Sequence, residues 1–204
     1  MTRRMAVRGT AGLALAAAAA TVLGGCGIRA TEVPTDFGPA PSRAACQVAG
    51  GEVTEPGAQE FTAAVSLMCG GRLVDVDRVL PLRERQAADP VRMAGALLEE
   101  LGRSPSNGEE RAGFTTDVRG GLTVAGPGEG DPRGALRLGT LPEDLSVFAL
   151  AQVVCTFSES PAAASDGSVV LGGPDDSPLR RYSCTDEVRT RPGTAPTPAQ
   201  TVAP

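Results

Sequence analysis

The sequence predicts an α+β domain in which a mixed or antiparallel sheet carries two helices packed on one face. Three pairs of strand-like segments, within residues 62–80, 121–139 and 168–184, combine apolar residues with turn-forming dipeptides. Two segments with helical periodicity, 89–102 and 140–159, separate these pairs. The order strand, strand, helix, strand, strand, helix, strand, strand favours one sheet that is covered by helices from one side.

The first strand pair predicts a hairpin. Residues 62–69, TAAVSLMC, are typical of a buried strand, and residues 72–80, RLVDVDRVL, alternate between apolar and charged side chains. The glycines at 70–71 favour a tight turn between the two strands. We expect the valines of the second strand to face the core and Asp75 and Asp77 to face water. Two aspartates at this spacing are also possible metal ligands, but an alternating strand more often carries them on its solvated side.

Residues 89–102, DPVRMAGALLEELG, predict an amphipathic helix that lies on the sheet. Asp89 is a typical N-cap, Pro90 suits the first helical position, and Gly102 suits the position after the last turn. Apolar residues recur at helical spacing on one side of this helix. The solvent-facing side is expected to carry the charged residues Arg92, Glu99 and Glu100.

A glycine-rich segment separates the next two strands, which we expect at 121–125 and 134–139. This segment, GPGEGDPR at 126–133, lacks the Gly-Lys-Ser/Thr ending of a phosphate-binding loop, and no helix follows it directly. Its glycines, prolines and acidic residues favour a solvated turn. Residues 104–113, SPSNGEERAG, are also expected to be a loop.

Residues 140–159, TLPEDLSVFALAQVVCTFSE, predict the second helix. Thr140 and Glu143 have the spacing of a capping box. The later side chains are apolar nearly all round, which predicts a buried helix, although the apolar stretch is too short to cross a bilayer. Two closing strands, 168–173 and 179–184, are expected to flank a turn of sequence PDDSP.

The first 25 residues have the three-part composition of an export signal. Arg3, Arg4 and Arg8 form a cationic start, and residues 9–22 carry no charge. A transmembrane anchor needs about 20 apolar residues, which argues against that alternative. The pair Arg3-Arg4 leaves both the Sec and the twin-arginine export routes open.

The sequence Leu23-Gly24-Gly25-Cys26 closes this segment and resembles the lipobox of bacterial lipoproteins. The resemblance implies that residues 1–25 are a signal peptide and that the sulfur of Cys26 carries a diacylglycerol. This lipid is expected to bind the bilayer and to hold the protein on the extracytoplasmic face of the cell membrane. The alternative is an ordinary secretory signal in which the cysteine is coincidental.

Four further cysteines, an even number, are expected to form disulfides in an oxidising compartment: Cys46, Cys69, Cys155 and Cys184. Four cysteines allow three connectivities. We favour Cys46–Cys69 and Cys155–Cys184, because neighbours in sequence close the shortest loops. A metal site is disfavoured, because no two of these cysteines are close in sequence and the chain has no histidine.

The chain is expected to divide into a signal peptide, a tether, one domain and a tail. Residues 26–61 contain the lipidated N-terminus and a proline-rich tether, residues 62–188 form the domain, and residues 189–204 form a disordered tail rich in proline and threonine. Removal of the signal peptide takes away three arginines and no acid, so the formal charge falls from −5 to −8. Such an acidic chain is not expected to bind nucleic acid.

Three segments resemble the GerMN domain, a module of bacterial spore-germination proteins and exported lipoproteins. They are GRLVDVDRVL, DPVRMAGALLEEL and LSVFALAQVVCTFSES, and the resemblance covers about residues 62–185. The chain is most similar to the short GerMN-like lipoproteins of actinobacteria, in which CGI after the lipobox precedes a single domain. The resemblance implies a GerMN-like α+β fold and supplies no catalytic residues.

The residues themselves do not indicate catalysis. Without histidine there is no Ser-His or Cys-His pair. The neighbouring acids Glu99/Glu100 and Asp175/Asp176 are not arranged as an acid/base pair. We therefore expect no enzymatic activity, no cofactor and no metal.

Two functions are expected from these observations. The first is a non-enzymatic binding or assembly module of the cell envelope, anchored to the bilayer through Cys26, whose partner is an envelope protein or a cell-wall polymer. The alternative is a solute- or ligand-binding lipoprotein associated with a transporter, although an ordered domain of about 125 residues is short for two lobes and a cleft.

Overall fold

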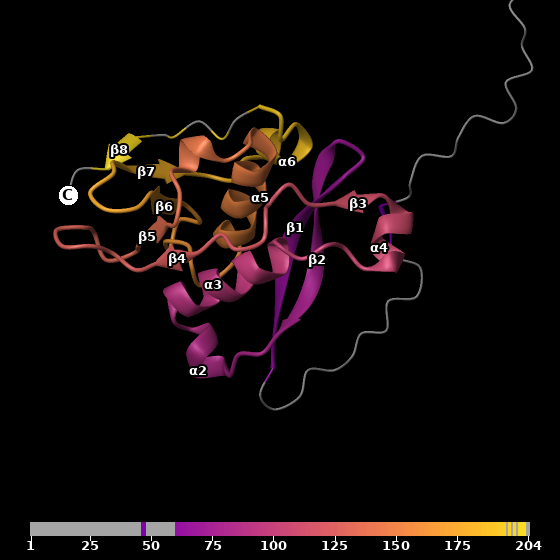
Figure 1. Ribbon diagram of the computed structural model, residues 1–204, viewed down its shortest axis with the longest axis horizontal. Coiled ribbons are helices and arrows are strands. Elements are labelled where there is room, and N and C mark those ends of the chain that lie inside the picture. The colour runs from indigo at the N-terminus through magenta and orange to yellow at the C-terminus, as the bar shows by residue number, and fades with distance from the viewer. Residues whose placement is uncertain (1–45, 48–59, 195, 197, 199, 203–204) are drawn as a thin grey trace, which may run out of the picture. The chain divides into compact units, whose positions relative to one another are not determined.

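The computed structural model describes residues 46–47, 60–194, 196, 198 and 200–202, and Figure 1 shows their arrangement. The described residues contain both helices and strands, and the strands form a three-stranded sheet and a five-stranded sheet. The predicted α+β class is therefore confirmed. The strands divide between two sheets, however, where their order along the chain predicts a single one.

The three-stranded sheet contains β1 (Phe61–Cys69), β2 (Arg72–Leu80) and β3 (Phe114–Thr115), in the order β2-β1-β3. β1 and β2 form the predicted antiparallel hairpin, with Cys69 opposite Arg72. The two glycines of the turn have φ angles of 60° and 81°. A two-residue turn of this kind requires positive φ, which glycine adopts without steric cost.

Both faces of this hairpin are partly covered. Val74 and Val76 are half-buried and pack against the main core, as the alternating pattern predicts. On the other face, Leu73 lies in a second buried cluster with Met68 and Val188. The hairpin therefore contributes to two apolar clusters.

The five-stranded sheet contains five short strands in chain order: β4 (Val124–Ala125), β5 (Ala135–Leu138), β6 (Val169–Gly172), β7 (Leu179–Tyr182) and β8 (Gln200–Val202). β5 and β6 are parallel, and the other neighbouring strands are antiparallel. A parallel pair needs a long crossover connection, and the second predicted helix supplies it. This sheet is therefore mixed.

The helical segments are α2 (Glu84–Ala87), α3 (Pro90–Leu101), α4 (Asn107–Ala112), the 3-10 turn η1 (Pro142–Asp144), α5 (Val147–Ser158) and α6 (Asp186–Thr190). The longest are α3 and α5, with 12 residues each, and Figure 1 shows α5 between the two sheets. Among the described residues, no helix combines the length and the hydrophobicity that a membrane span requires.

α3 begins at the predicted cap. The side chain of Asp89 accepts hydrogen bonds from the backbone N–H groups of Val91 and Arg92. Gly102 follows the helix, but its φ of −77° is not the left-handed conformation typical of glycine at that place. Glycine is needed there for another reason, because a Cβ atom would lie 3.0 Å from the Cα atom of Gly120.

The loop predicted at 104–113 is wrong, because α4 lies within it. The hydroxyl of Ser106 accepts a hydrogen bond from the backbone of Glu109, whose carboxylate accepts one from the backbone of Ser106. This reciprocal capping box starts the helix, and Gly113 ends it with a φ of 89°. Local capping thus stabilises a helix that has too few residues to show a clear periodicity.

α5 begins later than the sequence predicts, and the predicted capping box is not formed. The hydroxyl of Ser146 caps the helix by accepting a hydrogen bond from Ala149, whereas Thr140 precedes a separate 3-10 turn. Leu145 has an extended backbone (φ −70°, ψ 148°) between that turn and the helix, which interrupts the helical segment. The helix is buried as predicted, because all residues from 149 to 157 are buried.

The two polar residues in the middle of α5 bind the backbone of β1. The hydroxyl of Thr156 accepts a hydrogen bond from the N–H of Ser66 at 2.9 Å, and the side-chain amide of Gln152 donates one to the carbonyl of Ser66 at 3.0 Å. The Gln152 carbonyl oxygen also accepts a hydrogen bond from the N–H of Asp117 at 2.8 Å. α5 therefore satisfies the edge of β1 beyond the short strand β3.

One buried apolar cluster includes side chains from both sheets and from α3 and α5. Its fully buried members include Leu67 of β1, Leu97 of α3, Leu136 of β5, Phe157 of α5 and Leu171 of β6. The two sheets therefore share a core, with α5 between them, and form one folded unit.

The tail predicted at 189–204 is not entirely disordered. Arg189 and Thr190 belong to α6, and Pro192 and Pro196 are buried. The last described residues form β8, which pairs with β7 in an antiparallel register. Val202 of β8 packs against a small apolar cluster on the outer side of the sheet, which explains why this polar-rich segment is ordered.

We expect Gln152→Leu to lower the free energy of unfolding by about 1–3 kcal/mol, because it leaves the buried carbonyl of Ser66 without its partner and removes the hydrogen bond to the N–H of the exposed residue Asp117. Ser158→Ala is the matched control, because the hydroxyl of Ser158 is buried in the same helix without a hydrogen-bond partner among the described residues. Urea unfolding monitored by circular dichroism measures both variants. Equal losses for both would contradict the role given to Gln152.

Candidate functional site

Two disulfides connect four of the predicted site residues. Cys46 is joined to Cys69 and Cys155 to Cys184, with Cα–Cα distances of 5.8 and 4.8 Å. This is the connectivity favoured by the sequence, and it is confirmed. The fifth predicted site residue, Cys26, lies outside the described residues.

Each disulfide connects a terminal segment to the core. Cys69 ends β1, next to the hairpin turn, and the backbone N–H of Cys46 donates a hydrogen bond to the carbonyl of Ala112 at 3.2 Å. Cys155 is fully buried in α5, whereas Cys184 lies between β7 and α6. In the chain-entropy model, loops closed over 23 and 29 residues stabilise a fold by about 3 kcal/mol each.

Asp75 and Asp77 share the outer face of β2 but have different surroundings. Asp75 accepts hydrogen bonds from the hydroxyl of Ser66 at 2.7 Å and from the guanidinium of Arg189 at 2.9 Å. Arg189 also pairs with Glu159 and so connects α6, β2 and the end of α5. Asp77 is exposed. The part of the chain that the structure describes contains no cluster of three or more residues able to hold a metal ion.

A second group of charged residues lies between β2, α3 and α4. It contains Arg78, Glu100, Arg103 and Glu109. Arg78 lies 2.7 Å from the carboxylate of Glu109 and 3.7 Å from that of Glu100, which also pairs with Arg103 at 2.7 Å. Glu100 is only 7% exposed, so the prediction that it faces solvent is wrong. Glu99 is exposed and pairs with Arg103 at 3.4 Å. These carboxylates are compensated by arginines, an arrangement that stabilises structure.

The charge of Glu109 is favoured by its partners. Burial alone would raise the pKa of Glu109. Hydrogen bonds from Arg78 and Ser106 together lower it by more, so the pKa lies below its usual value. The ionised carboxylate therefore contributes to folding stability at neutral pH.

The glycine-rich segment between β4 and β5 is held by one arginine. The guanidinium of Arg137 contacts both carboxylate oxygens of Asp131, at 2.6 and 2.8 Å, and donates to the carbonyls of Gly173 and Ser177. The hydrogen bonds from Arg137 lower the pKa of Asp131. Asp131 also accepts a hydrogen bond from the N–H of Gly128 at 2.7 Å, so its oxygens stabilise the turn.

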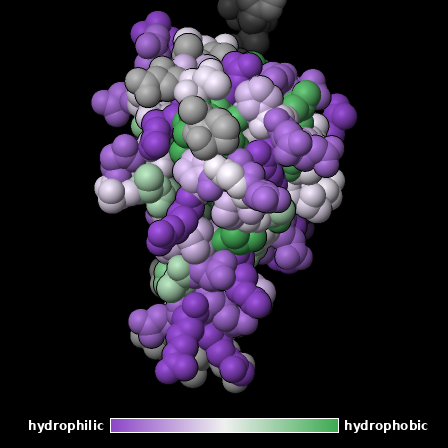
Figure 2. All heavy atoms as spheres, turned by 90° about the vertical axis from the view of Figure 1, so that its left-hand side faces the viewer, coloured by the Kyte–Doolittle hydropathy of each residue, from purple (hydrophilic) through white to green (hydrophobic). Residues whose placement is uncertain are grey.

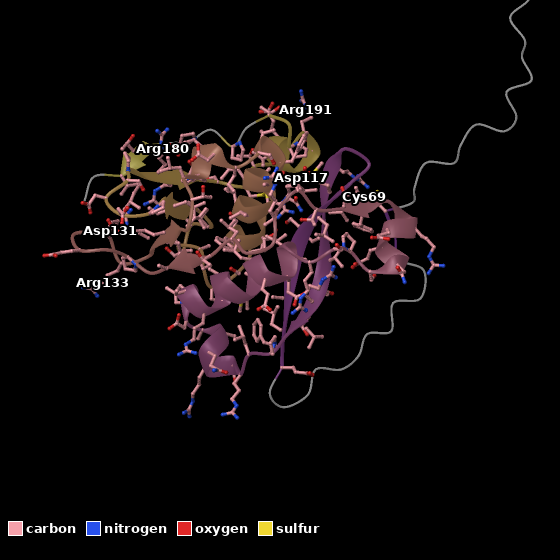
Figure 3. The ribbon with its side chains drawn as sticks, in the orientation of Figure 1. Cys69, Asp117, Asp131, Arg133, Arg180 and Arg191 are labelled. Carbon is pink, nitrogen blue, oxygen red and sulfur yellow. A yellow bond between two sulfur atoms is a disulfide. The ribbon has the colours of Figure 1, made fainter. Side chains whose placement is uncertain are left out.

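A cleft of about 640 Å³ lies beside the start of α5. Its wall combines three charged groups with hydroxyls: Asp117, Arg119, Asp144, Thr123, Thr140 and Ser146. A second cleft, of about 450 Å³, lies beside the Asp131–Arg137 pair and includes residues of β7 and β8. Figure 3 shows Asp117 near the middle of the molecule and Asp131 and Arg133 at the loop between β4 and β5.

The surface on the side of β4 to β8 is mainly hydrophilic. Figure 2 shows this side, with hydrophobic residues confined to small separate patches. Among the described residues, the large apolar side chains with the most exposure are Val79, at 41%, and Phe148, at 37%. They belong to β2 and α5, so they do not form one continuous segment of chain.

Sequence reasoning identified the disulfides but missed the polar residues that organise the fold. Gln152 and Thr156 stand four residues apart in an otherwise apolar helix, a spacing that places both on one face. That spacing was a usable signal of a shared partner. No comparable signal pointed to Arg137, because its partner carboxylate lies in a turn whose shape the sequence does not define.

Comparison with known protein families, with curated proteins and with solved structures finds no match for this chain. The resemblance to GerMN domains depends on the quoted sequence segments.

We expect the stability of the protein to fall as the pH drops below about 5, partly through protonation of Glu109. Its folded-state pKa is depressed, so its contribution is present above the usual value of 4.5 and is lost as the pH falls through the folded-state pKa. Glu109→Gln should be less stable than wild type at pH 7 by about 1–3 kcal/mol and should lose less stability on acidification.

Thermal unfolding between pH 3 and 7 measures both effects. Glu110→Gln is the control, because Glu110 is the exposed neighbour in the same helix. If Glu109→Gln and wild type lost stability in parallel on acidification, the linkage assigned to Glu109 would be wrong.

Proposed function

We propose that this chain is a lipid-anchored, non-enzymatic binding or assembly module on the extracytoplasmic face of a bacterial cell membrane. The observation that carries the proposal is the sequence Leu23-Gly24-Gly25-Cys26 at the end of a cationic and then uncharged N-terminal segment. A diacylglycerol on Cys26 supplies two acyl chains, which hold a protein at a bilayer far more firmly than one chain does.

The two disulfides support an extracytoplasmic location. Structural disulfides persist in oxidising compartments, whereas the bacterial cytosol keeps thiols reduced. Cys155 is fully buried against the core, and the disulfides connect segments that are 23 and 29 residues apart in sequence, which is typical of a structural disulfide. With Cys26 reserved for lipid, every cysteine of the exported chain has a role.

The chemistry of the described side chains supports a binding role. The chain has no histidine, so no imidazole is available as a general base near neutral pH. Among the described residues, the buried carboxylates of Glu100, Glu109 and Asp131 are all paired with arginines. A GerMN-like module, as the sequence segments imply, would act by binding an envelope protein or a cell-wall polymer.

The cleft beside α5 favours a second candidate function, a solute-binding lipoprotein that serves a transporter. Hydroxyls and charges of both signs line it, which suits a small polar or zwitterionic solute. In a thermal-shift screen of amino acids and monosaccharides, this second function predicts a ligand-dependent rise in melting temperature that Arg119→Ala reduces and Arg133→Ala does not. Arg133 lies in the loop between β4 and β5, away from this cleft (Figure 3). No rise with any solute would exclude these two classes as ligands.

The lipid anchor is tested in cells that express the full chain. Wild type should partition with membranes and incorporate an alkyne-labelled fatty acid, and globomycin should cause the precursor to accumulate. Cys26→Ala should lose the label and the lipid mass. Ile28→Ala, just outside the lipobox, should behave as wild type. If Cys26→Ala and wild type had the same mass and fractionation, the proposed anchor would be wrong.

A further inference from the structure

The two edges of the three-stranded sheet differ. On one side, β1 is covered by β3 and by the hydrogen bonds from Gln152 and Thr156 of α5. On the other side, β2 is the edge strand, and it is nine residues long. An edge strand of this length offers a row of backbone donors and acceptors to another chain.

The register identifies which backbone groups face outward. The N–H and C=O of Ser66 point away from β2, because both bind α5. Ser66 is opposite Asp75, so the N–H and C=O of Asp75 point away from β1 in the antiparallel pattern. Leu73, Asp77 and Val79 follow with the same period of two.

Among the described residues, few hydrogen bonds are made to these outward backbone groups. The carbonyl of Asp77 accepts a hydrogen bond from the side chain of Arg78, at 3.2 Å. The remaining outward N–H and C=O groups of Leu73, Asp75 and Val79 have no hydrogen-bond partner in the part of the chain that the structure describes. These backbone groups of β2 therefore have no internal partner that a further strand would displace, and α6 packs against the side chains of Leu73 and Asp75 at one end of the strand.

The side chains on this strand define the partner. Val79 has the highest exposure of the large apolar residues described, and the carboxylate of Asp77, two residues before it on the same face, is exposed without an ion pair among those residues. Asp75 on the same face is already bound by Ser66 and by the guanidinium of Arg189, so Asp77 is the carboxylate that a partner would meet. A strand whose side chains on this face are cationic would complement the carboxylate of Asp77, and the aliphatic stem of the next cationic side chain would lie against Val79.

A second copy of the chain does not fit this edge. If β2 paired in antiparallel fashion with β2 of another copy over all nine residues, Val76 would lie opposite Val76. That register places Asp75 opposite Asp77 twice, and like charges directly opposite each other are destabilising. Like charges thus disfavour pairing of β2 with itself over its full length.

We propose that β2 binds an extended, basic segment of another envelope protein by strand addition. The segment carries arginine or lysine at alternate positions, its backbone pairs with Leu73, Asp75, Asp77 and Val79, and one of its cationic side chains faces the carboxylate of Asp77. The proposal rests on the function proposed above and deepens it by naming the surface and the class of partner.

A synthetic nine-residue peptide of alternating valine and arginine tests the proposal on the full-length chain in detergent. We expect it to bind at least tenfold more tightly than the matched peptide of valine and glutamate. On binding, the amides of Leu73, Asp75, Asp77 and Val79 should become protected from hydrogen exchange. The same peptide with N-methyl groups on the edge that faces β2 should not bind, a control that leaves the protein unchanged.

Two variants of the strand separate charge from backbone pairing. Asp77→Arg should reverse the preference between the two peptides, whereas Glu129→Arg, an exposed acid in the loop between β4 and β5, should not. Asp77→Pro removes an outward N–H without removing a bond to β1, and it should abolish binding while the melting temperature stays within a few degrees. The N-methylated peptide gives the same information if that variant fails to fold.

The proposal would be overturned by equal binding of the N-methylated peptide, by a preference that Asp77→Arg leaves unchanged, or by amides of β2 already protected without peptide. These measurements use purified protein and soluble peptides, so they do not depend on the lipid at Cys26. Failure here and failure of the anchor experiment are therefore distinguishable.

Discussion

The hydrogen bonds between α5 and β1 connect the two sheets. A helix cannot normally satisfy the edge of a strand, because its own backbone groups are used within it. Here the side chains of Gln152 and Thr156 supply a donor and an acceptor one helical turn apart, and both reach the backbone of Ser66. Since these groups are buried, the bonds form in a low-dielectric interior where an unpaired group is costly. They fix the position of α5 along β1. Because α5 lies in the connection between β5 and β6, they also position that crossover.

Arginine is the partner in all the described ion pairs, because the chain contains no lysine or histidine. The planar guanidinium holds two or more acceptors at once, and Arg137, Arg189 and Arg78 each connect elements that are far apart in sequence. In this acidic, lysine-free chain, a few arginines therefore each bind several acceptors and make many of the polar contacts between elements. Substituting lysine at Arg137 would lose part of that geometry, because an ammonium group has no fixed fork.

The sequence was informative where local chemistry decides the structure. Three elements are predicted from their own residues: the hairpin turn from the glycine pair after β1, the start of α3 from the cap at Asp89, and α5 from its apolar residues. Among the three possible connectivities of the four cysteines, the favoured one is the one found. It failed where distant partners decide. The acid Glu100 is buried beside Arg78, which comes from a strand elsewhere in the sequence. α4 depends on a capping box within a polar segment, and residues 200–202 form a strand because β7 offers them an edge. The division into two sheets is of this second kind, since strand order does not say which strands pair.

The bond between Cys46 and Cys69 changes the path by which force crosses the molecule. It closes a covalent ring over 23 residues and enters the hairpin at its turn. A pull on the chain ahead of Cys46 is therefore transmitted to the turn end of β1 and bypasses the segment that joins Cys46 to Phe61. A protease that cut the chain within that ring would leave the pieces covalently joined, and only a reductant would then separate the domain from whatever holds its N-terminal side.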